Sequence, residues 1–302
     1  VLILFCCSCE KNEMDIEIPY EGDGTQINVC FVRDDQIDHS NFEVDIESLV
    51  LEETPWVMHS EIEFYDWSSH MFYLNVDKKK ADLTGKYFVV KSDEERLFLG
   101  YFISPVSSSF SYYPSVTAWD DFNYSKEIVE IGGFGGFHKD TMNSNIVFKE
   151  SLANSGLLKE GIDVELISLK RKSASTLTYT FKVTNLDTQN IYVLDPGRMG
   201  ASRFHYYSNG VSFWKDNKSY HANDFETTAT EQILFQWYYK LIPGKSIIRS
   251  VTLDGYTSLP TGIVNASFWF PSPFGLGKGE WKKNDGRIWL GNIQAKKEMN
   301  LN

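Results

Sequence analysis

The clearest pattern in this chain is a series of short apolar runs in its second half. From 177 to 183 apolar and polar side chains alternate strictly (Leu-Thr-Tyr-Thr-Phe-Lys-Val). Because successive side chains of a strand point to opposite faces, this alternation places one face in a core and the other in water. Comparable runs lie at 164–170, 191–194, 203–207, 211–214, 233–239, 247–253, 263–270 and 287–293.

These strands predict an antiparallel, immunoglobulin-like β-sandwich over 161–302, because they are short, apolar on one face and without a long intervening helix. Two turn signals support the prediction. Asn209-Gly210 lies between aromatic runs and suits the positive φ angles of a type I′ hairpin. Pro243-Gly244 suits the centre of a type II turn.

The first half has shorter and less regular elements. Residues 87–91 and 96–103 are β-branched and aromatic runs around a polar turn, which predicts an antiparallel hairpin. Ser60 and Glu63 have the spacing of a capping box, so we expect one helical turn there. A second short helix is expected over 78–83. We therefore expect an N-terminal α+β domain over 25–136, in a chain that is mainly β.

A change in composition follows this domain. The five residues 132–136 include four glycines, and we interpret them as a bulged strand end or hinge. A phosphate cradle is disfavoured, because the order of strand, glycine-rich turn and helix is missing. The mixed, polar stretch 137–160, with a short helix near 151–159, is expected to be a linker between the two domains.

The chain begins with an apolar run, residues 1–5, followed by Cys6-Cys7-Ser8-Cys9 and a polar, acidic stretch. These residues resemble the leader of Bacteroides-type bacterial lipoproteins, in which a small residue precedes the cysteine that carries lipid. The resemblance implies that Cys9 is lipidated, that 1–9 is a truncated signal segment and that 10–24 is a tether. The apolar run is shorter than the roughly 7 to 15 residues of a complete signal core and too short for a membrane span of about 20. A buried strand with incidental cysteines is the alternative.

Composition narrows the classes of partner. The 302 residues carry 41 acidic and 29 basic side chains, a net charge of −12, which repels a phosphate backbone and argues against nucleic acid. Of four cysteines only Cys30 lies outside the leader, so no disulfide framework is expected. Its apolar surroundings favour a buried thiol. No cofactor is expected.

A second resemblance covers part of the first domain. The segments 62–67 (Ile-Glu-Phe-Tyr-Asp-Trp, with His70 downstream), 87–90 and 95–102 are similar to an uncharacterised group of bacterial lipoprotein domains. The resemblance implies a domain and brings no established activity.

Candidate chemistry is sparse. His59 and His70 bracket Glu61, Glu63 and Asp66, but they lack the spacing of a metal site, and no metal is expected. The serines of 107–109 lie in a polar loop without a nucleophile elbow. Asp34, Asp35 and Asp38 could hold calcium, although they lack the glycine and the closing glutamate of the familiar loop. No residue is predicted to be catalytic. Carboxylates of the first domain, Asp66, Asp120 and Asp121, leave a hydrolase open as an alternative.

Aromatic side chains are the strongest hint of binding. Tryptophans and tyrosines are frequent in the second half, and most are expected in the core. Trp281 is expected in an exposed loop, and Trp281, Tyr207 and Trp214 are the candidate ligand-binding residues. An exposed aromatic patch would mark an interaction surface.

The sequence therefore predicts a lipid-anchored lipoprotein of the bacterial envelope with a non-catalytic role in binding or assembly. An outer-membrane location is expected, and the choice between the periplasmic and the external face stays open. A protein partner is favoured over a glycan. The alternatives are a hydrolase of envelope or dietary polymers, a glycan-binding module, and a structural subunit that stacks edge to edge.

Overall fold

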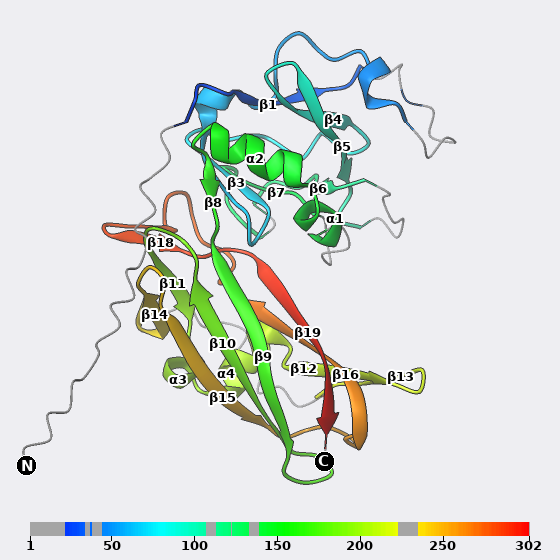
Figure 1. Cartoon of the computed structure of the whole chain (residues 1–302), viewed down its shortest axis with the longest axis vertical. Helices are drawn as coiled ribbons and strands as arrows, with labels where there is room; N and C mark the ends of the chain where they lie inside the picture. Colours follow the sequence, from blue (N-terminus) through cyan, green and yellow to red (C-terminus); the bar gives the residue numbers. More distant parts are fainter. Residues whose placement is uncertain are drawn as a thin grey trace, which may run out of the picture.

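The computed structural model describes residues 22–33, 37, 44–106, 113–121, 123–132, 139–222 and 235–301. The chain is mainly β, as predicted, with 46% of its residues in strands and 14% in helices. The strands form five sheets within the described residues. Two belong to an N-terminal unit (22–159) and three to a C-terminal unit (160–301), which lie end to end (Figure 1).

The N-terminal unit contains two four-stranded sheets, in the orders β1-β4-β5-β6 and β7-β3-β2-β8. The predicted hairpin is confirmed: β4 and β5 pair antiparallel, and Ser92 lies opposite Glu95 at their turn. The strands are β1 (Ile27–Phe31), β2 (Ile62–Asp66), β3 (Met71–Leu74), β4 (Tyr87–Ser92), β5 (Glu95–Ile103), β6 (Ser115–Thr117), β7 (Ile128–Glu130) and β8 (Leu158–Lys159).

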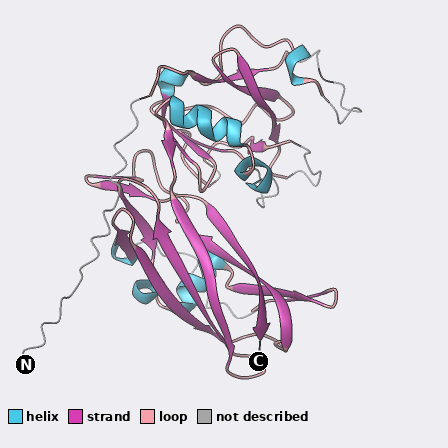
Figure 2. Cartoon of the chain, in the orientation of Figure 1, coloured by secondary structure: helices cyan, strands magenta, loops and turns pink. Residues whose placement is uncertain are grey.

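Helix α2 (Ile146–Asn154) corrects the prediction of a linker over 137–160. Asn145 caps the helix by accepting a hydrogen bond from the Phe148 N–H at 3.0 Å. The buried ring of Phe148 lies 5.0 Å from that of Tyr65, and β8 then pairs in parallel with β2. The segment looks polar because the helix buries only Phe148, Ser151 and Leu152. Figure 2 shows this helix beside the strands of the N-terminal unit. The short helix α1 (Lys139–Asn143) precedes it.

Of the two short helices expected in the first domain, one is present as a 3₁₀ turn and the other is replaced by an irregular segment. A 3₁₀ turn, η2 (His59–Glu61), begins one residue before the predicted turn, and β2 follows at once. Residues 78–83 form turns without a helix, which corrects that prediction. The Lys80 side chain is buried there and donates to the carbonyl of Ile128, and this contact needs an irregular backbone. Another 3₁₀ turn, η1 (Ile46–Ser48), lies between β1 and β2.

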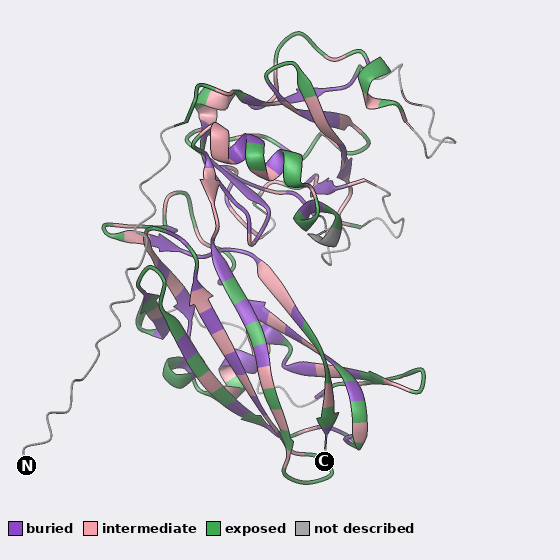
Figure 3. Ribbon diagram, viewed as in Figure 1, coloured by how far each residue is buried: buried purple, intermediate pink, exposed green. Residues whose placement is uncertain are grey.

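The C-terminal unit contains two sheets packed face to face, β15-β10-β9 and β13-β12-β16-β19. Phe181 of β10 lies 4.8 Å from Phe268 of β16 between ring centroids. Figure 3 shows the alternation of buried and exposed residues along β9 and β15 that the sequence pattern predicts. These strands are β9 (Ile162–Arg171), β10 (Leu177–Asn185), β12 (Val211–Lys215), β13 (Lys218–Tyr220), β15 (Ser246–Leu253), β16 (Gly262–Pro271) and β19 (Asn292–Leu301).

A third sheet of this unit, β14-β11-β18-β17, lies next to the N-terminal unit (Figure 1). In it β11 and β18 pair in parallel, whereas the other pairs are antiparallel. Its strands are β11 (Asn190–Leu194), β14 (Tyr238–Leu241), β17 (Lys282–Lys283) and β18 (Gly286–Ile288), and the 3₁₀ turn η3 (Phe235–Trp237) leads into β14.

The predicted strand at 203–207 is wrong, because these residues lie in helix α4 (Ala201–Ser208), which follows α3 (Pro196–Met199). Phe204 lies between the two large sheets, 5.7 Å from Phe181. Asn209 and Gly210 do adopt positive φ angles, but they end α4 and do not join two strands. The Pro243-Gly244 turn is confirmed: the Lys245 N–H donates to Ile242 O, and Gly244 has φ +67°.

Candidate functional site

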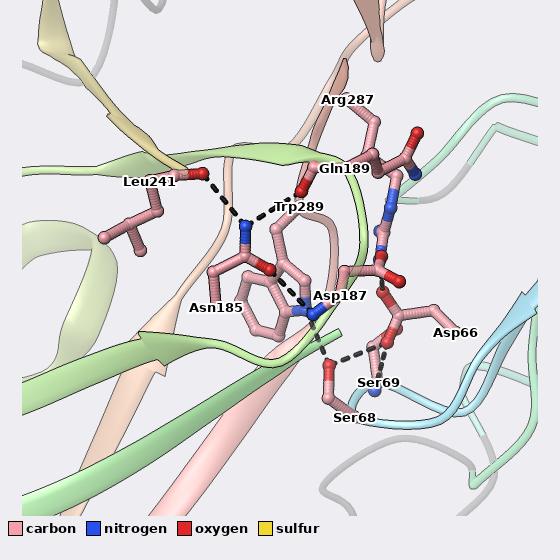
Figure 4. A network of polar contacts seen from close by, with 9 residues as sticks. All are labelled: Asp66, Ser68, Ser69, Asn185, Asp187, Gln189, Leu241, Arg287 and Trp289. Atoms are coloured by element: carbon pink, nitrogen blue, oxygen red, sulfur yellow. Dashed lines mark hydrogen bonds and ion pairs between the residues drawn. The ribbon is translucent and has the colours of Figure 1, made fainter. Parts of the chain in front are cut away.

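The two units meet around Arg287, a buried arginine of β18 (Figure 4). Its Nη2 lies 2.6 Å from Oδ2 of Asp66, which ends β2, and 2.9 Å from Oδ2 of Asp187 in the loop after β10. Nη2 donates an aligned hydrogen bond to Asp187, while the contact with Asp66 is an ion pair. The guanidinium also lies over the ring of Phe64, 5.1 Å from its centroid.

The two carboxylates favour the charged form of Arg287 although its side chain is buried. Burial by itself would lower the pKa of Arg287, but the carboxylates of Asp66 and Asp187 raise it above its ordinary value. A buried cation is stable only when carboxylates lie close to it in good geometry. Removal of one member of such an ion pair would leave a buried charge without compensation.

Neighbouring polar side chains fix the Asp66 carboxylate and the backbone of Asp187. Trp289 Nε1 donates to Ser68 Oγ at 2.9 Å, and Ser68 Oγ donates to Asp66 Oδ1 at 2.7 Å. Asn185 Oδ1 accepts from the Asp187 N–H at 2.8 Å. The Asn185 amide also donates to the carbonyls of Gln189 and Leu241, which holds the loop against β14 (Figure 4). The network joins the two units through residues distant in sequence.

Trp281 belongs to the same junction, which corrects the prediction that it lies in an exposed loop. Its side chain is 3% exposed, and its ring lies 4.7 Å from Tyr73 and 5.6 Å from Phe64. Its Nε1 donates to Oε1 of the buried Glu127 at 2.7 Å, and the Gly279 N–H donates to the same oxygen. The glycines and lysines around Trp281 suggested a solvated loop, but the loop turns its ring toward the N-terminal unit.

The carboxylates of the hydrolase alternative do not gather in one place as free acids. Asp66 is buried in the ion pair with Arg287. Asp120 accepts from the Lys80 N–H at 2.6 Å and lies 3.6 Å from Lys126 Nζ. Partial burial would raise the pKa of Asp120, but these partners lower it below its ordinary value. Asp121 lines a cleft of about 450 Å³ between the units, together with Asp77, 123–126 and 275–278.

The histidine cluster forms no metal site among the residues that the structure describes. His70 is buried, with φ +57°, and its ring nitrogens lie 3.1 Å from Tyr65 OH and 3.0 Å from Asn143 Oδ1. His59 instead accepts from the Ile27 N–H. Both histidines thus stabilise the N-terminal unit.

Trp214 is the one sequence candidate whose ring is largely in solvent. It lies on β12, 55% exposed, beside a groove of about 430 Å³ on the outer face of the β13-β12-β16-β19 sheet. Polar and charged side chains share the lining: Ser212, Ser219, Asn265, Ser267, Lys296 and Glu298. Lys297 also borders the groove, but its Nζ lies 3.7 Å from Glu165 of β9. Most small-ligand sites are predominantly apolar with a few polar groups, whereas this groove has one exposed aromatic ring among mainly polar side chains.

The third candidate, Tyr207, lies on α4 and does not line this groove. It is half-buried, and its ring lies 5.1 Å from that of Phe274. The three candidates therefore lie in three different places. Arg287, Asp187 and Glu127 are not among the candidates that the sequence provided. The signal available for Arg287 was its position as a single charged residue directly before the apolar run Ile288-Trp289-Leu290.

Several predictions fall outside the described residues: the lipid site Cys9, residues 10–21 of the tether, Asp34, Asp35 and Asp38, the serines 107–109, and glycines 133, 135 and 136. Cys30 is buried as predicted, and burial raises the pKa of its thiol, which disfavours the reactive thiolate. None of the described helices combines the length and the hydrophobicity that a bilayer crossing requires.

No protein-family model matches the sequence. No curated protein matches it either.

Proposed function

We propose that this protein is a lipid-anchored lipoprotein of the bacterial outer membrane that binds a ligand at the cell envelope without catalysing a reaction. The leader resemblance around Cys9 supports the anchor. The observation that carries the binding role is Trp214, a large ring held in solvent by a regular strand, beside a groove with polar walls. Tryptophan is enriched at interaction sites, which favours Trp214 as a contact residue.

The junction supports a non-catalytic role. Asp66 and Glu127, the buried carboxylates nearest the contact between the units, already bind Arg287 and Trp281. Acid–base catalysis needs carboxyl groups that face a substrate across a cleft, about 5 to 9.5 Å apart in glycosidases. Of the alternative's three residues only Asp121 lines the cleft between the units. A hydrolase therefore has less support than a binding protein.

An immunoglobulin-like topology for the C-terminal unit stays a prediction. Two antiparallel sheets packed through Phe181 and Phe268 support it. The parallel pair β11–β18 and the helices α3 and α4 are departures from the usual arrangement.

Two measurements test the proposal. Mass spectrometry of the protein extracted from native membranes should find acyl groups on Cys9, and an unmodified Cys9 would contradict the anchor. For the binding role, isolated envelope material should retain the wild-type chain and Trp119→Ala, but retain Trp214→Ala poorly. Trp119 is the matched control, since it is 48% exposed but lies in the N-terminal unit. Equal retention of all three proteins would contradict a binding role at Trp214.

A further inference from the structure

We propose that the groove beside Trp214 binds a neutral saccharide, an inference that rests on the proposed binding role and names its ligand class. The groove lies on the side of the C-terminal unit from which the β12–β13 hairpin projects (Figure 1). It is formed by regular strands, so its side chains are held at fixed spacings before any ligand arrives.

Strand register arranges the lining in rows. Trp214 of β12 lies opposite Asn265 of β16, which lies opposite Glu298 of β19. In the next row Ser212 lies opposite Ser267, and Ser267 opposite Lys296. Because side chains alternate between faces, both rows lie on the outer side of the sheet, away from the core residues Phe213, Ala266 and Phe268.

This arrangement complements the chemistry of a sugar ring. A pyranose has an apolar face of C–H groups and a rim of hydroxyls that both donate and accept hydrogen bonds. The Trp214 indole offers a flat apolar surface for the C–H face. The side chains of Asn265, Lys296 and Glu298 provide donors and acceptors within one or two strands of it.

The polar groups of the groove have capacity for a ligand. Among the described residues, the side chains of Trp214, Asn265 and Lys296 form no hydrogen bond or ion pair with one another or with other groups. The outer face of β10 and β15 is different, because its hydroxyls pair across the strands: Thr178 with Thr252, and Thr180 with Ser250, each at 2.8 Å. On the face around Trp214, Ser267 already accepts from Gln294, but Asn265 and Lys296 retain hydrogen-bonding groups for a ligand.

Charge and polarity select a neutral glycan over other partners. Lys296 and Glu298 lie two residues apart on β19 and carry opposite charges. An acidic sugar would therefore gain little net electrostatic attraction at this groove. The net charge of −12 disfavours nucleic acid, which also stacks on aromatic rings. Protein interfaces need an apolar core depleted of charge, whereas Trp214 has polar neighbours across the groove.

A longer saccharide would follow β16. Trp269 lies on the same face of this strand as Asn265, four residues further along, and is partly exposed. At about 3.3 Å per residue the two positions are about 13 Å apart, a distance that several linked sugar rings span. We therefore expect an oligosaccharide to bind more tightly than its monosaccharide.

An array of neutral and acidic oligosaccharides tests the proposal with the full 302-residue chain. We expect binding to neutral glycans, a loss of affinity of about tenfold or more in Trp214→Ala, and a smaller loss in Asn265→Ala. Trp119→Ala should bind as the wild type does. Circular dichroism of each variant establishes that it is folded, and Trp214→Phe, which keeps a ring on the strand, should retain part of the affinity.

Three results would overturn the proposal: no glycan bound by the folded chain, exclusive binding of acidic glycans, or a bound glycan whose affinity is the same for wild type and Trp214→Ala. A protein partner lost in Trp214→Ala, with no glycan bound, would also overturn it while leaving the broader binding role intact. Cys9 lipidation is measured separately, so the two proposals fail independently.

Discussion

Arg287 of β18 and Asp66 of β2 form a buried ion pair between the two units, with 2.6 Å between Nη2 and Oδ2. Both side chains are almost fully removed from solvent, and Asp187 supplies the second carboxylate. The apolar side chains around the pair belong to one continuous core, in which Phe64 and Tyr73 of the N-terminal unit join the residues of the C-terminal unit. The two units are therefore expected to unfold together.

Replacement of Arg287 by methionine should lower the free energy of unfolding by about 3–5 kcal/mol, because it leaves two carboxylates buried without a cation. Urea denaturation measures the loss. The control is Lys79→Met, which breaks the exposed ion pair with Asp82 and should leave the urea midpoint almost unchanged. The triple variant Arg287→Met, Asp66→Leu, Asp187→Leu should recover part of the stability. An equal loss of stability in Arg287→Met and Lys79→Met would contradict a structural role for the buried pair.

Trp281 and Glu127 should be energetically coupled, since the indole N–H donates to a carboxylate that is itself buried. Trp281→Phe removes the donor and should cost about 1–3 kcal/mol in addition to the lost packing. A double-mutant cycle with Glu127→Met, which removes the acceptor, isolates the coupling. Strict additivity of the two substitutions would show that the hydrogen bond contributes nothing to the junction.

Gly161, at the passage from the N-terminal to the C-terminal unit, should tolerate no side chain. It has φ +76°, and a Cβ there would collide with Ser68 and with Asp66 of the junction. Gly244 has a comparable φ of +67° with open space around it. Alanine at 244 should therefore cost about 1–3 kcal/mol from backbone strain, and alanine at 161 about 1–3 kcal/mol more from the collision. Thermal or urea unfolding of both variants checks the difference.

Asp120 should stabilise the N-terminal unit in a pH-dependent way. Its pKa is lowered in the folded chain, so its contribution is present above the unfolded value of about 3.9 and is lost as the pH falls through the lower, folded value. The urea midpoint of Asp120→Asn should lie below that of the wild type near neutral pH, and the two should converge in acid. A gap that stays constant with pH would contradict this assignment.

The elements that the sequence predicted well depend on local pattern. Strict alternation identified β10, and the turn residues Pro243-Gly244 identified the link between β14 and β15. The elements that it missed depend on distant contacts. Residues 203–207 are rich in aromatics and read as a strand, yet they form α4 because Phe204 fits between two sheets.

The candidate residues divide in the same way. The exposure of Trp214 follows from strand alternation, because its side chain points to the face of β12 that is opposite to the buried face of Phe213. Trp281 could not be placed from its neighbours in sequence, because its burial depends on Phe64, Tyr73 and Glu127 in the other unit. Asp66 looked like a free carboxylate for the same reason, since its partner Arg287 is remote in sequence.

Hydrogen–deuterium exchange of the full chain, with and without the neutral oligosaccharide that binds best on the array, tests the location of the binding site most directly. Peptides from β12, β16 and β19 should exchange more slowly when the oligosaccharide is bound. Slower exchange confined to 119–130 and 275–281, around the cleft between the two units, would contradict it.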